Sequence, residues 1–467
     1  MALSKGIKRL ILLTTSLAAF QTPYNSTALS FIIPVLGRFF HASLYTLIYI
    51  PVVYLIPLPT LMILLGRIAD IYGRVGIFRV GLVIFTIGSL MGALSTNVHL
   101  LIAASFIMGL GSAILSPSST AIVSQVFPEG ERGFALGINA MAVYIGLTSA
   151  PFLGGIITQF LGWRYILLIS TMLSLIGLAV SYASMRSIEV ARRGESLDTI
   201  GALTFSLALI SIVMYLILSS LNGWLNYAYL LMVGVASLIV FILLEGRVKY
   251  PMLNLRLFTG NVSFMAGNVT ALLNYISTYF VPFTFSLYLQ VILGYNPFEA
   301  GLILVLEPIF MVILSPVSGR LSDVYGSREI AALGMGLIGL SFILLLTLNI
   351  RSITNILIAL STLGIGFGLF SAPNTNSVMS SVSRDKYGVA SGVLGTMRFT
   401  GQLLSVTIAG SILTKYLGKY AVLYLFTGVP MVKVTVYQAF IDGLRVTLTV
   451  AAALSFLGVY TSLLRER

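Results

Sequence analysis

Two ionisable side chains lie in the middle of long apolar stretches, where lipid or tightly packed helices would surround them. Glu307 lies about ten residues into the stretch 297–320, and Arg398 lies about eleven residues into 387–414. At 1.5 Å per residue, Glu307 is about 15 Å from the nearer end of its helix, which is the middle of a bilayer. A charge at that depth costs at least ~2.5 kcal/mol and normally faces a partner or a wet cavity. These two residues are therefore the first candidates for function.

Glu307 could carry a coupling proton, because a carboxyl group removed from water gains or loses its proton according to the charges near it. Arg398 could tune that exchange. Two alternatives stay open: a structural ion pair between the two residues, or a Glu307 that stays protonated in a packing site. All the other acidic residues of the chain, 14 in total with Glu307, fall in predicted loops or at helix mouths.

The composition indicates an all-α integral membrane protein. The chain has 467 residues, of which 58% are hydrophobic and 9% charged, and its mean hydropathy is +1.01. A soluble domain carries about 25% charged residues. With no cysteines and two histidines, both in predicted loops, we expect no metal site and no cofactor. We attribute the net charge of +13 to membrane topology rather than to nucleic-acid binding. No motif indicates an enzyme.

Fourteen apolar stretches are long enough to span a bilayer, which takes roughly 20 residues. They lie near residues 9–34, 43–66, 77–96, 98–122, 132–160, 163–185, 198–220, 226–245, 262–292, 297–320, 329–349, 353–380, 387–414 and 440–463. If the stretches alternate in direction, 19 of the 27 Lys and Arg residues fall in one set of loops. Both termini are then expected on the cytoplasmic side of the plasma membrane, by the positive-inside rule.

An internal repeat divides the chain. Gly66-Arg-Ile-Ala-Asp70-Ile-Tyr-Gly73 recurs as Gly319-Arg-Leu-Ser-Asp323-Val-Tyr-Gly326, 253 residues further on. Two six-helix halves do not need so long an offset, so about 60 residues are inserted between them. The predicted domains, in chain order, are a six-helix bundle over 1–185, two extra membrane helices over 186–261 and a second six-helix bundle over 262–467.

The segment 416–440 is the one part of the second bundle that does not read as a span. It is short, and Gly428 and Pro430 interrupt it between two runs of β-branched and aromatic residues. We expect an external, hairpin-like loop there.

These features resemble the major facilitator superfamily, and the six-plus-two-plus-six layout resembles its fourteen-helix drug:proton antiporter branch. The resemblance covers nearly the whole chain. The family's loop signature, G-x-x-x-D-x-x-G-R, reads here as Gly66, Asp70, Gly73 and Arg74. Its antiporter signature on the fifth helix, G-x-x-x-G-P-x-x-G-G, appears as Gly146, Ala150, Pro151, Gly154 and Gly155, with alanine in place of one glycine.

The resemblance implies roles for both signatures. Asp70 would latch the cytoplasmic side by accepting from a helix N-terminus near Asp385, and a second latch would use Gly319, Asp323, Gly326 and Arg328. An ordinary helix-connecting turn is the alternative, which the two aligned copies make less favourable. On the fifth helix, Pro151 would bend the chain and seal the halves against leakage, whereas the alternative is simple packing of small residues.

The resemblance also implies a central cavity between helices 9–34, 98–122, 262–292 and 353–380. Five amides on these helices are candidates to line it: Asn25, Asn268, Asn274, Asn374 and Asn376. Taken singly, each amide favours an interhelical hydrogen bond over a ligand contact. As a group, together with Phe280, Phe283, Phe285 and Tyr288, they suit a bulky, mostly apolar solute.

The function implied is alternating-access export of small lipophilic or drug-like solutes in exchange for protons, by a monomer. Two departures from the branch bear on this: Asn25 stands where an acidic residue is usual, and Ser105 where an arginine is usual. Proton coupling then depends on Glu307. The alternative is a uniporter, or a dedicated metabolite exporter, without proton coupling. A transporter-like receptor is a remote alternative, since such proteins usually append a soluble signalling region and none is recognisable here.

Overall fold

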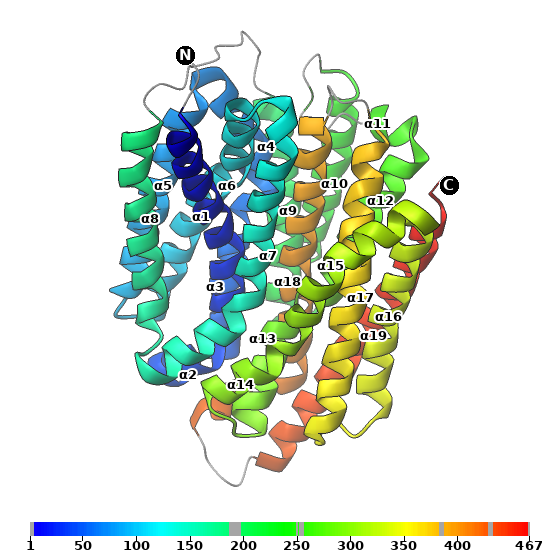
Figure 1. Cartoon of the computed structure of the whole chain (residues 1–467). Coiled ribbons are helices and arrows are strands. Elements are labelled where there is room, and N and C mark those ends of the chain that lie inside the picture. Colours follow the sequence, from blue (N-terminus) through cyan, green and yellow to red (C-terminus); the bar gives the residue numbers. More distant parts are fainter. Residues whose placement is uncertain are drawn as a thin grey trace.

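A computed structural model of the chain describes residues 4–185, 198–248, 251, 256–382, 387–427 and 433–465. Every regular element within these residues is a helix, and the helices stand side by side in one bundle (Figure 1). Both chain ends point to the same end of the bundle, which we call the terminal end. The other is the opposite end.

The described residues form fourteen spans in the predicted six-plus-two-plus-six order, because α3 with α4, α12 with α13, and α14 with α15 each make one broken span. The first half contains α1 (Lys5–Phe31), α2 (Ile33–Phe40), α3 (Leu44–Leu55), α4 (Pro57–Tyr72), α5 (Arg74–Ala93), α6 (Val98–Val126), α7 (Glu129–Phe160) and α8 (Arg164–Ser184). The two extra helices are α9 (Thr199–Asn222) and α10 (Ala228–Glu245). The remainder contains α11 (Arg256–Thr259), α12 (Val262–Thr278), α13 (Val281–Leu287), the π-helical turn η1 (Tyr288–Ile292), α14 (Pro297–Leu304), α15 (Leu306–Tyr325), α16 (Ser327–Thr347), α17 (Ile353–Ser380), α18 (Tyr387–Thr427) and α19 (Lys433–Leu463).

Eleven spans of the described chain are long and apolar enough to cross a membrane. The remaining three, α1, α12–α13 and α18, carry more Ser, Thr, Asn and Gln, and many of these polar side chains are buried. Polar helices are tolerated there because protein rather than lipid surrounds them. The interior of the bundle is therefore built largely on α1, α12–α13 and α18.

Prolines account for the broken spans, because proline has no N–H to donate and disrupts a helix. The α3–α4 break falls at Ile56, before Pro57, and the α14–α15 break falls at Val305, shortly before Pro308. These breaks fall on corresponding spans of the two halves, although the offset between them is 249 residues rather than 253. The turns that follow also match, since Gly73 (φ 111°) and Gly326 (φ 93°) both adopt a backbone conformation that favours glycine.

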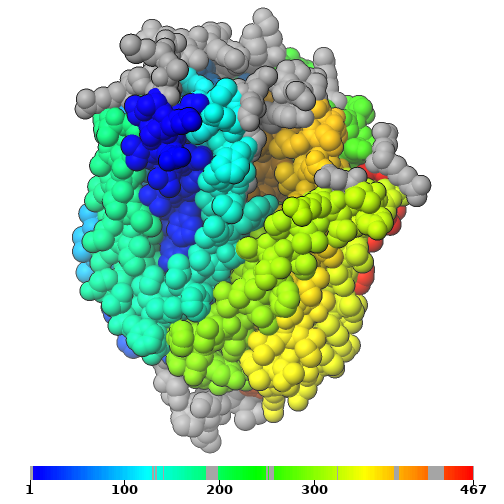
Figure 2. Space-filling model, in the orientation of Figure 1, coloured from blue at the N-terminus to red at the C-terminus, as the bar shows by residue number. Residues whose placement is uncertain are grey.

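The two extra helices cover one seam between the halves. α9 packs on α10 and also contacts α4 of the first half and α18 of the second. The Phe205 and Phe241 rings lie 5.0 Å apart between α9 and α10. The other seam is formed by α7 and α14–α15, whose side chains (cyan and yellow-green) meet at the surface in Figure 2.

The segment 416–440 differs from the expected hairpin. Helix α18 continues to Thr427 with a break in its helical path at Gly418 (φ 68°), and α19 begins at Lys433. Residues 428–432 lie outside the described part of the chain. Runs of β-branched and aromatic residues do not by themselves require a strand, since strand propensity depends strongly on context.

Candidate functional site

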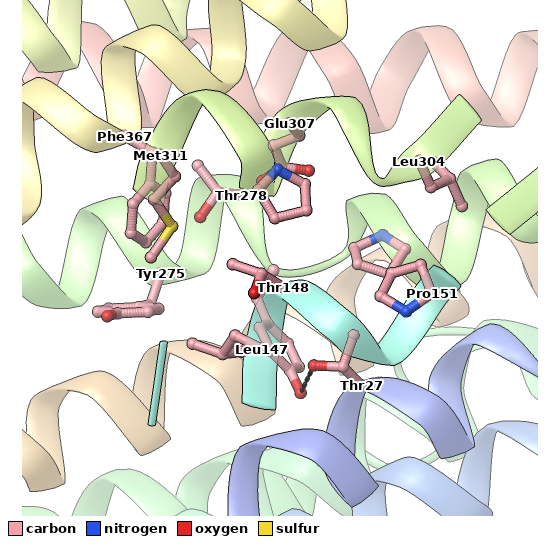
Figure 3. A pocket seen from close by; sticks show the side chains of 13 residues that line it. Thr27, Leu147, Thr148, Pro151, Tyr275, Thr278, Leu304, Glu307, Met311 and Phe367 are labelled. Carbon is pink, nitrogen blue, oxygen red and sulfur yellow. Dashed lines mark hydrogen bonds between the residues drawn. The ribbon is translucent and has the colours of Figure 1, made fainter. Parts of the chain in front are cut away.

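Glu307 lies in a cavity at the α7–α15 seam. It is the second residue of α15, directly after the break at Val305, and it is half-buried. The cavity is lined from α7 by Leu147, Thr148 and Pro151, and from α12 by Tyr275, Thr278 and Tyr279. Figure 3 shows Glu307 on the wall that faces Leu147 and Thr148. Within the described part of the chain, the Glu307 carboxyl has no hydrogen bond or ion pair.

The repeat explains why Glu307 lacks a partner. The backbone oxygen of Glu307 packs directly on Gly364, and the backbone oxygen of Tyr54 packs in the same way on Gly109. Glu307 is therefore the counterpart of Tyr54, 253 residues further on. The Tyr54 hydroxyl is fully satisfied, because it donates to the Thr22 carbonyl oxygen at 2.8 Å and meets the Ser112 hydroxyl at 2.8 Å. Glu307 has taken the place of this tyrosine without such a network.

The Arg398 side chain lies in a second cavity, between α1, α6, α7 and α18. Its guanidinium stacks on the Phe399 ring at 4.8 Å and interacts with the Tyr275 hydroxyl. The ion pairs of the described residues do not include a Glu307–Arg398 pair. Leu147 lines both cavities and so separates the two charged residues.

Both cavities are small in this conformation. The Glu307 cavity encloses about 50 Å³ and the Arg398 cavity about 10 Å³. Sites for drug-sized ligands usually measure about 300–1,000 Å³. A solute of that size could therefore enter only after the helices around these cavities move apart.

The opposite end is closed by contacts between positions that correspond in the repeat. The Tyr279 hydroxyl donates to the Ser26 hydroxyl at 2.7 Å across 253 residues of sequence, and Ser286 donates to the Phe31 carbonyl oxygen across 255. Arg38 donates to the Gln290 carbonyl oxygen at 2.8 Å across 252. Equivalent positions meet only near an axis that relates two halves, so α1 and α12–α13 cross at the pseudo-twofold axis of the bundle.

The glycines of the fifth-helix signature lie where α7 approaches its neighbours most closely. A Cβ added to Gly146 would strike the Phe20 carbonyl oxygen of α1, and one added to Gly155 would lie 2.6 Å from the Pro297 carbonyl oxygen of α14. From the other side, a Cβ on Gly301 would lie 2.5 Å from the Pro151 carbonyl oxygen. Gly154 is less restricted, with Phe31 at 3.5 Å. Within the signature, Gly146 and Gly154 thus pack α7 on α1 of the same half, whereas Gly155 and Pro151 pack it on α14 of the second half.

The same close packing recurs on α18, where the sequence showed no such signature. Gly401 is seated against Leu272 and Tyr275 of α12, and Gly410 is seated against Ile48 of α3. These two glycines follow Gly146 and Gly155 by 255 residues. The offset of the repeat could have identified them.

At the terminal end, Asp70 pairs with Arg74 one turn further on, at 2.6 Å. Arg74 also donates to the Ala121 carbonyl oxygen of α6 at 3.3 Å. Gly66 packs on Pro117 of α6, where an added Cβ would lie at 3.4 Å. The first signature therefore ties α4 to α5 and α6 within one half. Its expected partner near Asp385 lies outside the described residues.

The second signature is arranged similarly. Gly319 lies near Ala372 of α17, at 3.9 Å from an added Cβ, and Gly326 forms the turn. Arg328 donates to the Arg465 carbonyl oxygen at 3.4 Å, which ties α16 to the end of α19. The side chain of Asp323 lies outside the described part of the structure.

The five amides expected to line a cavity take other places. Asn25 is fully buried, accepts a hydrogen bond from Ser170 of α8 at 2.9 Å and donates to the Gln21 carbonyl oxygen. Asn268 is also fully buried and donates to the Phe264 carbonyl oxygen of its own helix, at 2.9 Å. Both amides join helices or satisfy backbone groups.

The remaining three amides have other surroundings. Asn274 donates to the Met335 sulfur at 3.4 Å, Asn374 accepts from Arg465, and Asn376 is exposed. The cavities are lined by none of the five. Tyr275, Tyr279 and Thr22 line them in their place, and the only sequence signal for these residues was their position on the three polar spans.

Comparisons with known proteins agree with this architecture. The family model described as "Major Facilitator Superfamily" matches residues 15–243 and 268–458. The chain is 28% identical over 395 residues to the riboflavin transporter RibZ of Clostridioides difficile (strain 630), covering 84% of this chain and 85% of that protein. It is 32% identical over 375 residues to the cephamycin export protein CmcT of Amycolatopsis lactamdurans, covering 77% and 76%.

Two further similarities concern drug resistance and fold. The multidrug resistance protein Stp of Mycobacterium tuberculosis (strain CDC 1551 / Oshkosh) is 28% identical over 413 residues, covering 87% of this chain and 76% of Stp. A solved bacterial homologue of the human lysosomal transporter Spinster has the same fold, with a TM-score of 0.69 and 16% identity over 99% of each chain. The chain thus belongs to the major facilitator superfamily, and it is a multi-pass membrane transporter rather than an enzyme.

Proposed function

We propose that this transporter exports small lipophilic or drug-like solutes by alternating access, in exchange for protons that Glu307 carries. The observation that carries the proposal is the unpartnered Glu307 carboxyl in a cavity between the halves. Because no neighbouring cation or hydrogen-bond network in the described chain holds one protonation state, the proton can respond to the arrival of solute and to which end is open.

The contacts of the opposite end support the alternating-access part of the proposal. Hydrogen bonds from Tyr279 and Ser286 hold α12–α13 to α1 there, and a hydrogen bond from Arg38 holds α2 to η1. Opening that end requires these bonds to break while the terminal end closes through the two glycine turns. We infer that the terminal end, with its basic loops, faces the cytoplasm, and that one chain is the working unit.

A dedicated metabolite transporter without proton coupling is the second candidate. Asn25 stands where the related branch has an acidic residue, and its side chain is hydrogen-bonded to Ser170 and to the Gln21 carbonyl oxygen. The Ser105 hydroxyl donates to the Leu101 carbonyl oxygen. Neither residue is available to relay a proton. A relative named as a riboflavin transporter supports a metabolite as solute.

Everted membrane vesicles, with the cytoplasmic face outward, distinguish the two candidates. The probe is the compound that most raises the thermal stability of the purified protein, chosen from fluorescent drug-like dyes, quinolones and riboflavin. Proton exchange predicts accumulation in an acidic lumen, by about tenfold per pH unit for one proton exchanged with a neutral solute, and its loss with nigericin. Uptake that merely equilibrates, whatever the gradient, would support the uncoupled transporter.

A further inference from the structure

The Arg398 cavity contains polar groups that the proton pathway does not use. Thr22 comes from α1, Ser116 from α6, and Arg398 and Gln402 from α18. The apolar part of the wall is made by Phe399 and, on α7, by Val143 and Leu147. The cavity therefore combines one permanent cation with polar side chains and an apolar wall, and both halves of the bundle contribute to it.

Several of these polar groups are buried and have no partner within the described chain. Gln402 is 1% exposed and its Oε1 has no hydrogen bond; Thr22 is 2% exposed and its Oγ1 has none. The Nε of Arg398 is also unsatisfied. Buried polar groups normally find partners, so three such atoms around one cavity indicate that a ligand supplies the missing bonds.

We propose that Arg398, Gln402 and Thr22 bind the carboxylate of an amphipathic organic anion, which is one class of solute that this transporter carries. A guanidinium offers two parallel N–H donors that match the two oxygens of a carboxylate. The Thr22 hydroxyl and the Gln402 amide add further hydrogen bonds, since the orientation of a glutamine amide follows its partners. Phe399 and Leu147 contact the apolar body of the solute.

The charge balance of the interior also favours an anion. Among the residues that line the two cavities, Glu307 is the one acidic side chain, and it lines the first cavity alone. Its carboxyl group is neutral whenever it carries a proton. The positions on α1 and α6 where charges are usual in related transporters hold Asn25 and Ser105, which are neutral. Arg398 then dominates the field in the cavity, so a cationic solute is repelled and an anionic one attracted.

This inference rests on the proposed function, because it names the solute of that transport, but it is tested by binding alone. The probes are aromatic carboxylic acids that share a ring system with their methyl esters, beginning with nalidixic acid and its ester. Binding to the purified full-length protein is measured by thermal stabilisation across a concentration series. We expect the acid to bind more tightly than the ester, and Arg398→Gln to weaken the acid by about tenfold to hundredfold while leaving the ester unchanged.

Further variants keep the test decisive if Arg398→Gln fails to fold. Thr22→Val conserves the side-chain shape and removes one hydrogen-bond donor, so it should lower the affinity for the acid several-fold. Arg398→Lys keeps the positive charge but loses the two parallel N–H donors, so it should retain part of the preference for acid over ester that Arg398→Gln loses. Arg351→Gln removes an exposed arginine that contacts Tyr437 outside the cavity and should change nothing. Equal affinity of wild-type protein for acids and esters, or no binding of any acid, would overturn the proposal. Failure of proton coupling would leave this binding preference intact.

Discussion

Glu307→Gln is expected to abolish accumulation driven by a pH gradient and to leave exchange of solute for solute in place. Glutamine has nearly the same shape as a protonated glutamate, so the cavity keeps its form, but the amide cannot release a proton. In everted vesicles the steady-state accumulation should therefore fall from about tenfold per pH unit to no accumulation. Counterflow of labelled against unlabelled solute, which needs no net proton movement, should stay within about twofold of wild type.

The matched control is Glu131→Gln, which removes an exposed carboxylate that pairs with Lys8 at 2.8 Å near the start of α7. A surface pair of this kind contributes little, on the order of 0–1 kcal/mol, so both transport measurements should resemble wild type. If Glu307→Gln still accumulates solute against its gradient, Glu307 is not the proton carrier.

Gly155→Val should disable transport by preventing closure of the opposite end. The added Cβ would lie 2.6 Å from the Pro297 carbonyl oxygen, so α7 and α14 would have to separate. Overpacking of this kind costs typically about 1–3 kcal/mol, which lowers the population of the closed arrangement by roughly tenfold or more. We expect a comparable loss of efflux at normal expression, measured as retention of a fluorescent solute by cells.

Gly137→Val is the control for the same helix, because a Cβ there meets nothing within 4 Å. The chain has no cysteines, so a single cysteine at Thr148 can report access to the Glu307 cavity. An impermeant thiol reagent added outside the cell should label Thr148→Cys faster when Gly155→Val is present, and no faster with Gly137→Val. Wild-type efflux and labelling in Gly155→Val would show that the α7–α14 contact does not close the pathway.

The overall fold was predictable because it depends on hydropathy and on the repeat. Apolar runs locate spans whatever their neighbours are, and the two copies around Asp70 and Asp323 set the order of the halves. The three polar spans are helical close to the expected ranges, although they are less apolar than the other eleven. The prolines near the breaks in α3–α4 and α14–α15 can be read from the sequence. Whether a given proline ends a helix depends on whether neighbouring groups form hydrogen bonds with the backbone groups that it leaves without a partner.

The site was less predictable, because sequence gives the depth of a residue on a helix but not the direction in which it points. Glu307 was identified from depth and charge alone. Asn25 and Asn374 are also buried polar residues of long helices, yet their side chains bond to Ser170 and Arg465. The 253-residue offset of the repeat aligns Glu307 with Tyr54, but the residues around them are not alike, and the matching contacts with Gly364 and Gly109 support the alignment.

If solute and proton compete through Glu307, solute binding must release a proton, and this release can be measured directly. Purified protein in weakly buffered detergent solution is mixed with the stabilising solute while a pH indicator reports the protons released. Wild-type protein should release close to one proton per bound neutral solute, and Glu307→Gln none. A neutral solute is used because an anion bound at Arg398 would itself favour the protonated carboxyl. Binding without proton release in wild-type protein, or equal release by both proteins, would contradict it.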